Sequence, residues 1–315
     1  MKKWLVLVSV AGLLSACSGM NKNTVSYQMS KYDQQVYYVV AGEGADKEAA
    51  VKDALTNMRK NIVENVPNVL QEVPAPVNDV LANAKTGKVW RDKSVKNPKK
   101  YYALAVLKRQ TAEKILQAPA NELDAQLGAF ATQLQANNDK FSGMRNAFAM
   151  QPLLVKRNVL QDLYIFLSED HNGYEAARFD GYKKIYQDRL AAIKVMTVVR
   201  GEEKITLLTR ITDAINQMGL SAAEPEDAQA VLSVEVDAKV DGYGSERVKG
   251  LHWAATSAAV SMRDLQNGTT FARFNVNDRA GTNRQADSVR KSMEGIGDKA
   301  SVEIVNRLTN YLKTK

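Results

Sequence analysis

The hydrophobic positions along this chain follow two different spacings, and the two alternate along the sequence. Residues 35–40 (QVYYVV) and 101–108 (YYALAVLK) are rich in β-branched and aromatic side chains, which is typical of strands. In residues 47–66 and 286–312, apolar side chains recur at every third or fourth position and would form one face of a helix. The pattern predicts an α+β fold in which helices pack on antiparallel sheets.

Residues 35–117 are predicted to form the first of two small αβ domains. Its first strand is expected to end at the turn Gly42-Glu43-Gly44, and the next helix to begin at Asp46, a residue type favoured at N-caps. Residues 86–95 and 101–108 both have strand composition, and an Asn-Pro pair lies between them, so they are predicted to pair as a hairpin. The expected order is strand, helix, hairpin.

A helical segment is predicted between the two domains, over residues 118–193. Apolar residues three or four positions apart indicate helices in residues 121–134, 152–167 and 174–193. We expect these helices to run antiparallel and either to pack on the first domain or to space it from the second. The aromatic residues of the last helix are expected in a core rather than in a ligand cage: Phe179, Tyr182 and Tyr186.

Residues 194–315 are predicted to form the second αβ domain. The dipeptide Asn267-Gly268 is the strongest hairpin signal in the chain, because both residue types tolerate the positive φ of a type I′ turn. The order strand, helix, three strands, helix is predicted over residues 195–199, 201–218, 230–240, 251–264, 269–275 and 286–312. This order resembles the αβ domains of the Tol-system periplasmic protein and of curli-secretion lipoproteins.

Residues 1–16 have the three-part layout of a secretory signal peptide. Lys2 and Lys3 precede an apolar run from Trp4 to Leu14, and small residues follow. A transmembrane helix is one alternative, but the run is shorter than the roughly 20 residues that span a bilayer. A cleaved signal for soluble export is another, but Cys17 occupies the best small-residue triplet for such cleavage.

The motif Leu14-Ser15-Ala16-Cys17 resembles the lipobox of bacterial lipoproteins. Cys17 is the only cysteine of the chain, and the resemblance implies that it is the lipidation site and the first residue of the mature protein. Two or three acyl chains hold a protein durably on a membrane. In the sorting pattern of such proteins, aspartate after the cysteine retains them at the inner membrane, so Ser18 implies the outer membrane. We expect the folded part to face the periplasm. Residues 17–34 are largely polar and are predicted to be a flexible tether.

The chain carries a mild positive charge, formally +8. A dedicated nucleic-acid binder would more often cluster its charge on one helix or face, so no nucleic acid partner is expected. Anionic lipid headgroups or an acidic wall polymer such as peptidoglycan are the expected electrostatic partners. The basic run Arg91–Lys100 is most simply a solvated hairpin tip, and the alternative is a polyanion contact. The candidate residues for that contact are Lys93, Lys96, Lys99 and Lys100.

The sequence shows none of the common active-site patterns. Once Cys17 is acylated, no thiol remains for a disulfide, a metal site or a nucleophile. His171 and His252 lack the context of a zinc site or a Ser-His-Asp relay, and His252 is predicted to be a packed or partly exposed strand residue. Glu202-Glu203 and Glu224-Glu226-Asp227 fall at predicted helix starts or in turns. We therefore predict no cofactor, no metal and no enzymatic activity.

Several of these elements together resemble a known family. The elements that carry the resemblance are a strand, the turn Gly42-Glu43-Gly44, a helix containing residues 48–55 (EAAVKDAL), Val89-Trp90-Arg91-Asp92 and residues 101–107 (YYALAVL). In this order they are similar to the LPP-twenty family of bacterial lipoproteins. The similarity covers residues 35–117. Members of that family, and related domains in flagellar outer-membrane ring proteins, are small αβ modules that assemble or decorate envelope structures. The resemblance implies envelope protein partners and brings no active-site residue with it.

Three functions follow as hypotheses. The first is a non-enzymatic structural or assembly factor of the cell envelope, anchored in the outer membrane and associated with a flagellar or secretion structure. The second is a regulatory lipoprotein that binds peptidoglycan or lipid through the lysines of the hairpin tip. The third is an envelope hydrolase, which would require the fold to bring two carboxylates together.

Overall fold

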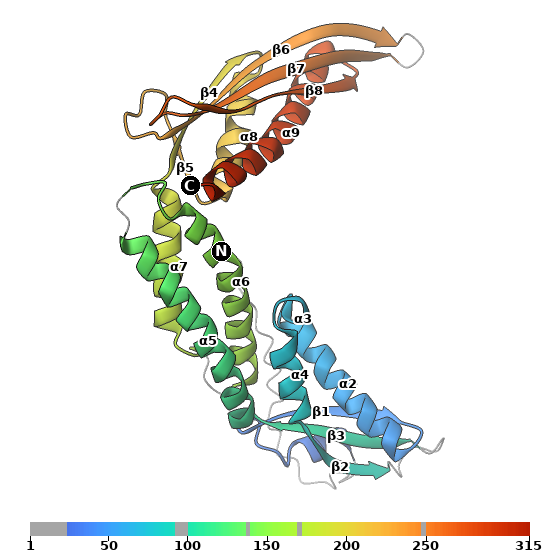
Figure 1. Cartoon of the computed structure of the whole chain (residues 1–315). Coiled ribbons are helices and arrows are strands. Elements are labelled where there is room, and N and C mark those ends of the chain that lie inside the picture. The colour runs from blue at the N-terminus through green and yellow to red at the C-terminus, as the bar shows by residue number, and fades with distance from the viewer. Residues whose placement is uncertain (1–23, 92–99, 137–138, 169–171, 247–249) are drawn as a thin grey trace, which may run out of the picture. The chain divides into compact units, whose positions relative to one another are not determined.

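The computed structural model describes residues 24–91, 100–136, 139–168, 172–246 and 250–315. Within these residues the predicted α+β class is confirmed, because helices pack against two separate sheets (Figure 1). The chain divides into two compact units with one sheet each. Among the described residues, unit 1 comprises those through Pro119 together with Val159–Tyr174, and unit 2 comprises those of Ala120–Asn158 and Glu175–Lys315.

The described strands of unit 1 form an antiparallel sheet in the order β1-β3-β2. They are β1 (Tyr37–Gly44), β2 (Lys85–Arg91) and β3 (Tyr101–Lys108). The pairing of β2 with β3 confirms the predicted hairpin. The helix α2 (Lys47–Asn65) packs on this sheet, and Asp46 caps it by accepting a hydrogen bond from the Ala49 N–H at 2.8 Å. Two short helices follow, α3 (Val69–Glu72) and α4 (Pro74–Ala82).

Gly42 and Gly44 lie inside β1, so the prediction that the strand ends at Gly42-Glu43-Gly44 was wrong. A Cβ atom at Gly42 would lie 2.1 Å from the backbone nitrogen of Ala54, and one at Gly44 would lie 2.4 Å from that of Ala50. Both of these alanines belong to α2. The glycines therefore allow the helix to approach the strand closely instead of turning the chain.

The predicted tether over residues 17–34 was wrong for its second half. A short helix, α1 (Val25–Met29), begins after Thr24, whose side-chain oxygen accepts a hydrogen bond from the Tyr27 N–H at 3.2 Å. Three apolar residues of this region pack against the core around Trp90: Val25, Met29 and Tyr32. The polar average of the stretch concealed their spacing, which places them on one side. Residues 17–23 lie outside the described residues.

The predicted helical segment, residues 118–193, does not form a body of its own in the described chain. The helices α5 (Arg109–Ala136) and α6 (Met144–Leu167) contribute to both units, and α7 (Ala176–Ala191) belongs to unit 2. The division in α5 falls at Pro119, an internal proline that cannot donate a helical hydrogen bond. The aromatic stripe of α7 lies in or against an apolar cluster with α5 and α6, which confirms its prediction as core: Phe179, Tyr182 and Tyr186.

Within unit 1, Arg109 binds the end of α6. Its Nη1 atom donates to the carbonyl oxygens of Phe166, Leu167 and Ser168, at 3.2, 2.9 and 3.3 Å. These carbonyls lie at a helix C-terminus, where intrahelical donors run out and a cation is favoured. One guanidinium therefore ties the start of α5 to the last turn of α6.

The sheet of unit 2 has the order β5-β4-β6-β7-β8. Its strands are β4 (Lys194–Gly201), β5 (Ser221–Ala223), β6 (Leu232–Glu246), β7 (Leu251–Asp264) and β8 (Thr270–Thr282). The strand β4 runs parallel to β5 and β6, whereas β6, β7 and β8 form the predicted antiparallel meander. The helices α8 (Lys204–Gln217) and α9 (Gln285–Lys313) contact each other and cover one face (Figure 1). Among the described strands, β8 pairs with β7 alone and forms one edge of the sheet.

Three strands of unit 2 are longer than predicted, β4 by a few residues and β6 and β8 by more, and one strand was not predicted. The strand β6 extends past residue 240 to Glu246, and β8 extends past residue 275 to Thr282. Glycine, asparagine and aspartate weaken the strand signal in these extensions, but pairing with β7 continues through them. The short strand β5, Ser221–Ala223, has too few residues for a recognisable pattern.

Candidate functional site

Most of the residues that the sequence singles out for function lie outside the described residues. They are Cys17, Lys93, Lys96 and Lys99. Lys100 is described, and its Nζ atom lies 3.0 Å from Oε1 of Glu43 on β1. The hydrogen bond to this carboxylate, together with the attraction of its charge, raises the pKa of Lys100. Both side chains are about half exposed, at 44% and 55%. A polyanion would therefore compete with Glu43 for this lysine.

The two histidines give no catalytic arrangement in the described part of the chain. His171 lies outside it, and His252 is a partly buried residue of β7, as predicted. The carbonyl oxygen of His252 accepts a hydrogen bond from Oγ of Ser288 at 2.6 Å, which attaches α9 to the sheet. Across the described ranges, no three His, Cys, Asp or Glu side chains gather so that they could hold a metal ion. No helix in those ranges is both long and apolar enough to cross a membrane.

One residue of each acidic cluster noted in the sequence accepts hydrogen bonds in the structure. Glu203 is the N-cap residue of α8, and Thr206 Oγ1 donates to its carboxylate at 3.3 Å. The Asp227 carboxylate accepts hydrogen bonds from the Gln229 N–H at 2.8 Å and from Lys194 Nζ at 3.1 Å, and both lower its pKa. The Glu203 carboxylate thus binds a side chain in the first turn of α8, and the Asp227 carboxylate holds a turn.

A buried ion pair in unit 2 escaped the sequence analysis. Nε of Arg157 on α6 lies 2.9 Å from Oδ1 of Asp124 on α5, and Nη2 lies 3.4 Å from Oδ2. Both residues are 0% exposed, and the Arg157 guanidinium lies 4.9 Å from the ring centroid of Phe179. In the sequence, the only sign of this ion pair is one charged residue among the apolar positions of each helix. Two nitrogen atoms of the guanidinium hold this carboxylate. The ion pair therefore stabilises the helices, and the carboxylate is poorly suited to acid–base chemistry.

A second buried carboxylate, Asp264, lies at the end of β7 and is 1% exposed. It accepts hydrogen bonds from the N–H groups of Gln266 and Asn267, at 2.9 and 3.4 Å, from the Tyr311 hydroxyl, and from Lys315 Nζ at 3.3 Å. Burial alone would raise the pKa of Asp264, but these hydrogen bonds, led by the one from Tyr311, hold it below the usual value. The carboxylate ties the β7–β8 turn to the end of α9.

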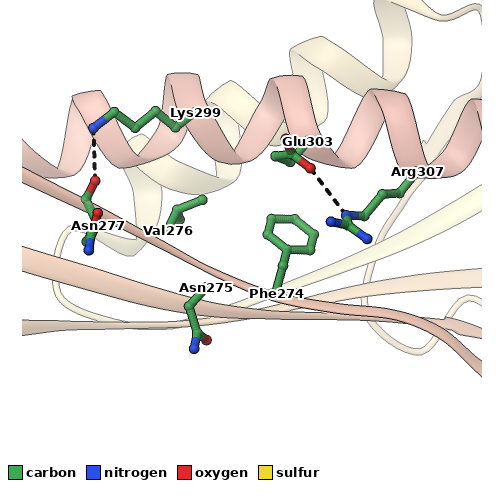
Figure 2. Close-up of a pocket in the computed structure, with 7 residues that line it drawn as sticks. All are labelled: Phe274, Asn275, Val276, Asn277, Lys299, Glu303 and Arg307. Atoms are coloured by element: carbon green, nitrogen blue, oxygen red, sulfur yellow. Dashed lines mark hydrogen bonds and ion pairs between the residues drawn. The ribbon is translucent and has the colours of Figure 1, made fainter.

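A groove lies between the edge strand β8 and α9, and we call it the β8–α9 groove (Figure 2). It is open to solvent and encloses about 400 Å³. Figure 2 shows that Phe274 and Val276 point toward α9, whereas Asn275 points away from it. The residues that line the groove are Phe274, Asn275, Val276, Asn277, Lys299, Glu303 and Arg307.

Ion pairs flank the apolar floor of this groove. Lys299 Nζ donates to the carbonyl oxygen of Asn277 at 2.9 Å and lies 2.7 Å from Oδ1 of Asp278. Nε of Arg307 lies 3.3 Å from Oε2 of Glu303, and its guanidinium carbon lies 4.9 Å from the ring centroid of Phe274. Glu303, which lines the groove, and the neighbouring Asp278 are thus each paired with a cation.

Two further hollows lie in unit 2. One, of about 320 Å³, lies between α8 and α9 beside Met218 and Val302. Val302, which lines it, is an apolar side chain with 62% exposure. The other, of about 450 Å³, is bordered by Lys140, Gln229 and Gln266. No histidine or cysteine lines any of the three described hollows.

No family model and no curated protein sequence matches this chain. Among solved structures, it is similar to a secreted protein of the human pathogen Helicobacter pylori, at 15% identity and a TM-score of 0.36, over 84% of this chain and 97% of that one. A protein described as a lipoprotein of Caulobacter crescentus matches at 13% identity and a TM-score of 0.30, over 41% and 96%. A minor lipoprotein of Acinetobacter baumannii matches at 10% identity and a TM-score of 0.30, over 39% and 96%.

Proposed function

We propose that this protein is a lipoprotein of the bacterial envelope, anchored in the outer membrane through acylated Cys17 and facing the periplasm, that acts as a non-enzymatic assembly factor. The observation that carries the proposal is the motif Leu14-Ser15-Ala16-Cys17 behind a basic and apolar start. The anchor places two αβ units near a membrane, and the resemblance of residues 35–117 to the LPP-twenty family supports a role in an envelope structure.

The open groove of unit 2 supports binding as the activity. Its apolar floor and flanking ion pairs lie on the surface, beside an edge strand. Exposed strand edges of this kind are used for protein recognition, because their main-chain groups can pair with another chain. Envelope proteins are therefore the partners that we propose, in an assembly such as a flagellar ring or a secretion structure.

The anchor is tested with two substitutions in the cell. Cys17→Ala should abolish incorporation of labelled palmitate, because the thiol that carries the diacylglycerol is removed. Ser18→Asp should leave labelling intact but shift the protein from the outer to the inner membrane on a density gradient. Labelling that persists in Cys17→Ala would refute the anchor, and an unchanged membrane distribution of Ser18→Asp would refute the outer-membrane placement.

The assembly role is tested by mild cross-linking in the cell, followed by purification from membranes. Enrichment of the components of one envelope structure over the Cys17→Ala control is the expected result. If only wall fragments or lipid are recovered, the assembly role is wrong.

The basic run around Lys100 gives a specific reason to test wall or lipid binding as a second function. Salt-sensitive retention on peptidoglycan sacculi or anionic vesicles should then be lost when the four lysines are replaced by glutamate: Lys93, Lys96, Lys99 and Lys100. Glu43→Gln is the informative companion, because it frees Lys100 from its carboxylate. It should increase retention if this surface binds polyanions.

A further inference from the structure

The main-chain groups of β8 alternate between pairing with β7 and facing the free edge of the sheet. The Leu265 N–H donates to the Val231 carbonyl on the β6 side, whereas the Asp264 N–H donates to the Thr269 carbonyl on the β8 side. Even-numbered residues of β7 therefore direct their main-chain groups toward β8, where their partners also have even numbers from Ala272 onward.

It follows that the odd-numbered residues of β8 present N–H and C=O groups to the free edge. The bond from Lys299 Nζ to the Asn277 carbonyl agrees with this, because that oxygen faces away from β7. The edge-facing residues in the central part of the strand are Arg273, Asn275, Asn277 and Arg279.

The side chains of these edge-facing residues are exposed, on the face of the sheet opposite α9. Arg273 and Arg279 both belong to this row, with two asparagines between them. On the other face, Phe274 and Val276 form the apolar floor of the β8–α9 groove. Cross-strand neighbours on one face of a sheet interact directly, and opposite charges stabilise the pair. A strand added here would meet two cations on one face and an apolar hollow on the other.

From this arrangement we propose that β8 and the β8–α9 groove bind an extended segment of a partner protein, added as a sixth strand, with acidic residues at its two ends and apolar residues between them. The proposal rests on the assembly role proposed above and names the kind of partner. Carboxylates of the segment would lie opposite Arg273 and Arg279, and its apolar side chains would enter the hollow beside Phe274 and Val276.

A second copy of the same strand fits this edge poorly. Two β8 strands paired antiparallel over their full length, Thr270–Thr282, would centre on Val276 and place Arg273 opposite Arg279. Like charges directly opposite each other destabilise a strand pair. The charge pattern therefore favours an acidic partner segment over self-association.

The test uses full-length protein in nonionic detergent and a labelled synthetic peptide, Glu-Ser-Thr-Val-Thr-Val-Glu, blocked at both ends. Fluorescence anisotropy should show at least about fivefold tighter binding than for the same peptide with lysine at both ends, and the preference should weaken with salt. Asn275→Pro should reduce the affinity at least tenfold, because it removes an edge-facing N–H and leaves the pairing with β7 intact. Asn275→Thr is the matched control and should bind like the wild type.

A charge reversal keeps the test decisive if the proline variant misfolds. The double variant Arg273→Glu with Arg279→Glu should prefer the lysine-ended peptide. Any one of four results would overturn the proposal. They are equal binding of the two peptides, binding that survives Asn275→Pro in a folded protein, absence of binding by either peptide, and a dimer that Asn275→Pro dissociates. None of these results depends on acylation, so failure here is distinct from failure of the Cys17 experiment.

Discussion

At the scale of single residues, two buried carboxylates organise unit 2 in different ways. Asp124 is paired with one guanidinium inside a helical core, whereas Asp264 collects hydrogen bonds from a turn and from the end of α9. Neither partner set could be read from the sequence, because Arg157 lies 33 positions from Asp124, and Tyr311 lies 47 positions from Asp264. Periodicity identifies which face of an element is buried, but it does not pair polar groups across the fold.

Replacing one member of the buried ion pair should strongly lower the stability of unit 2. Arg157→Ala leaves the Asp124 charge buried without its main partner, and we expect the free energy of unfolding of unit 2 to fall by about 3–5 kcal/mol. The double variant Asp124→Leu with Arg157→Met removes both charges and should recover most of that loss. Urea unfolding of the two proteins checks this, and a double variant as unstable as the single one would contradict it.

Asp264 should make the stability of unit 2 depend on pH. Its pKa is lower in the folded protein than in the unfolded chain, so its contribution is present above the usual aspartate pKa and is lost as the pH falls through the folded value. Asp264→Asn should lower the free energy of unfolding of unit 2 by about 1–3 kcal/mol at neutral pH and by much less in acid.

Urea unfolding at neutral pH and at pH values below the usual aspartate range measures this difference. Asp298→Asn is the control, because Asp298 forms an exposed pair with Arg210 and should contribute at most about 1 kcal/mol. Equal losses for Asp264→Asn at both pH values would show that its charge is not what stabilises the turn.

At the scale of elements, the sequence predicts regular helices and strands well and close approaches poorly. The spacing of apolar residues predicts a helix over residues 47–66 with Met58 and Ile62 on its buried face, and Asn267-Gly268 predicts the β7–β8 hairpin. Gly42 and Gly44, by contrast, have the local signature of a turn, and only the position of α2 shows why they are glycines.

Gly42→Ala tests that close approach. The added Cβ would meet the backbone of Ala54, which cannot rotate away, so α2 must shift, and we expect a loss of about 3 kcal/mol in the stability of unit 1. Gly181→Ala in α7 is the matched control, because no atom lies within 4 Å of its Cβ position. It should raise stability by up to about 1 kcal/mol through helix propensity. The account of β1 is wrong if both substitutions are neutral.

At the scale of the whole molecule, we propose a membrane-targeting N-terminus ahead of the two αβ units that the structure describes. Composition and motif predict the first, and the order of elements predicts most of the second. The β8–α9 groove was not predicted, because it depends on which strand ends up at the sheet edge and on where α9 crosses it. That information resides in the pairing of the strands, which a single sequence does not display.

The most direct test of the central claim is the mass of the N-terminal peptide of the mature protein, purified from its own membranes and digested with a protease. We predict a peptide that begins at Cys17 and carries the mass of a diacylglycerol and, in a triacylated form, one further acyl chain. A mature protein that begins at another residue, or one that carries an unmodified Cys17, would contradict the assignment as a lipoprotein.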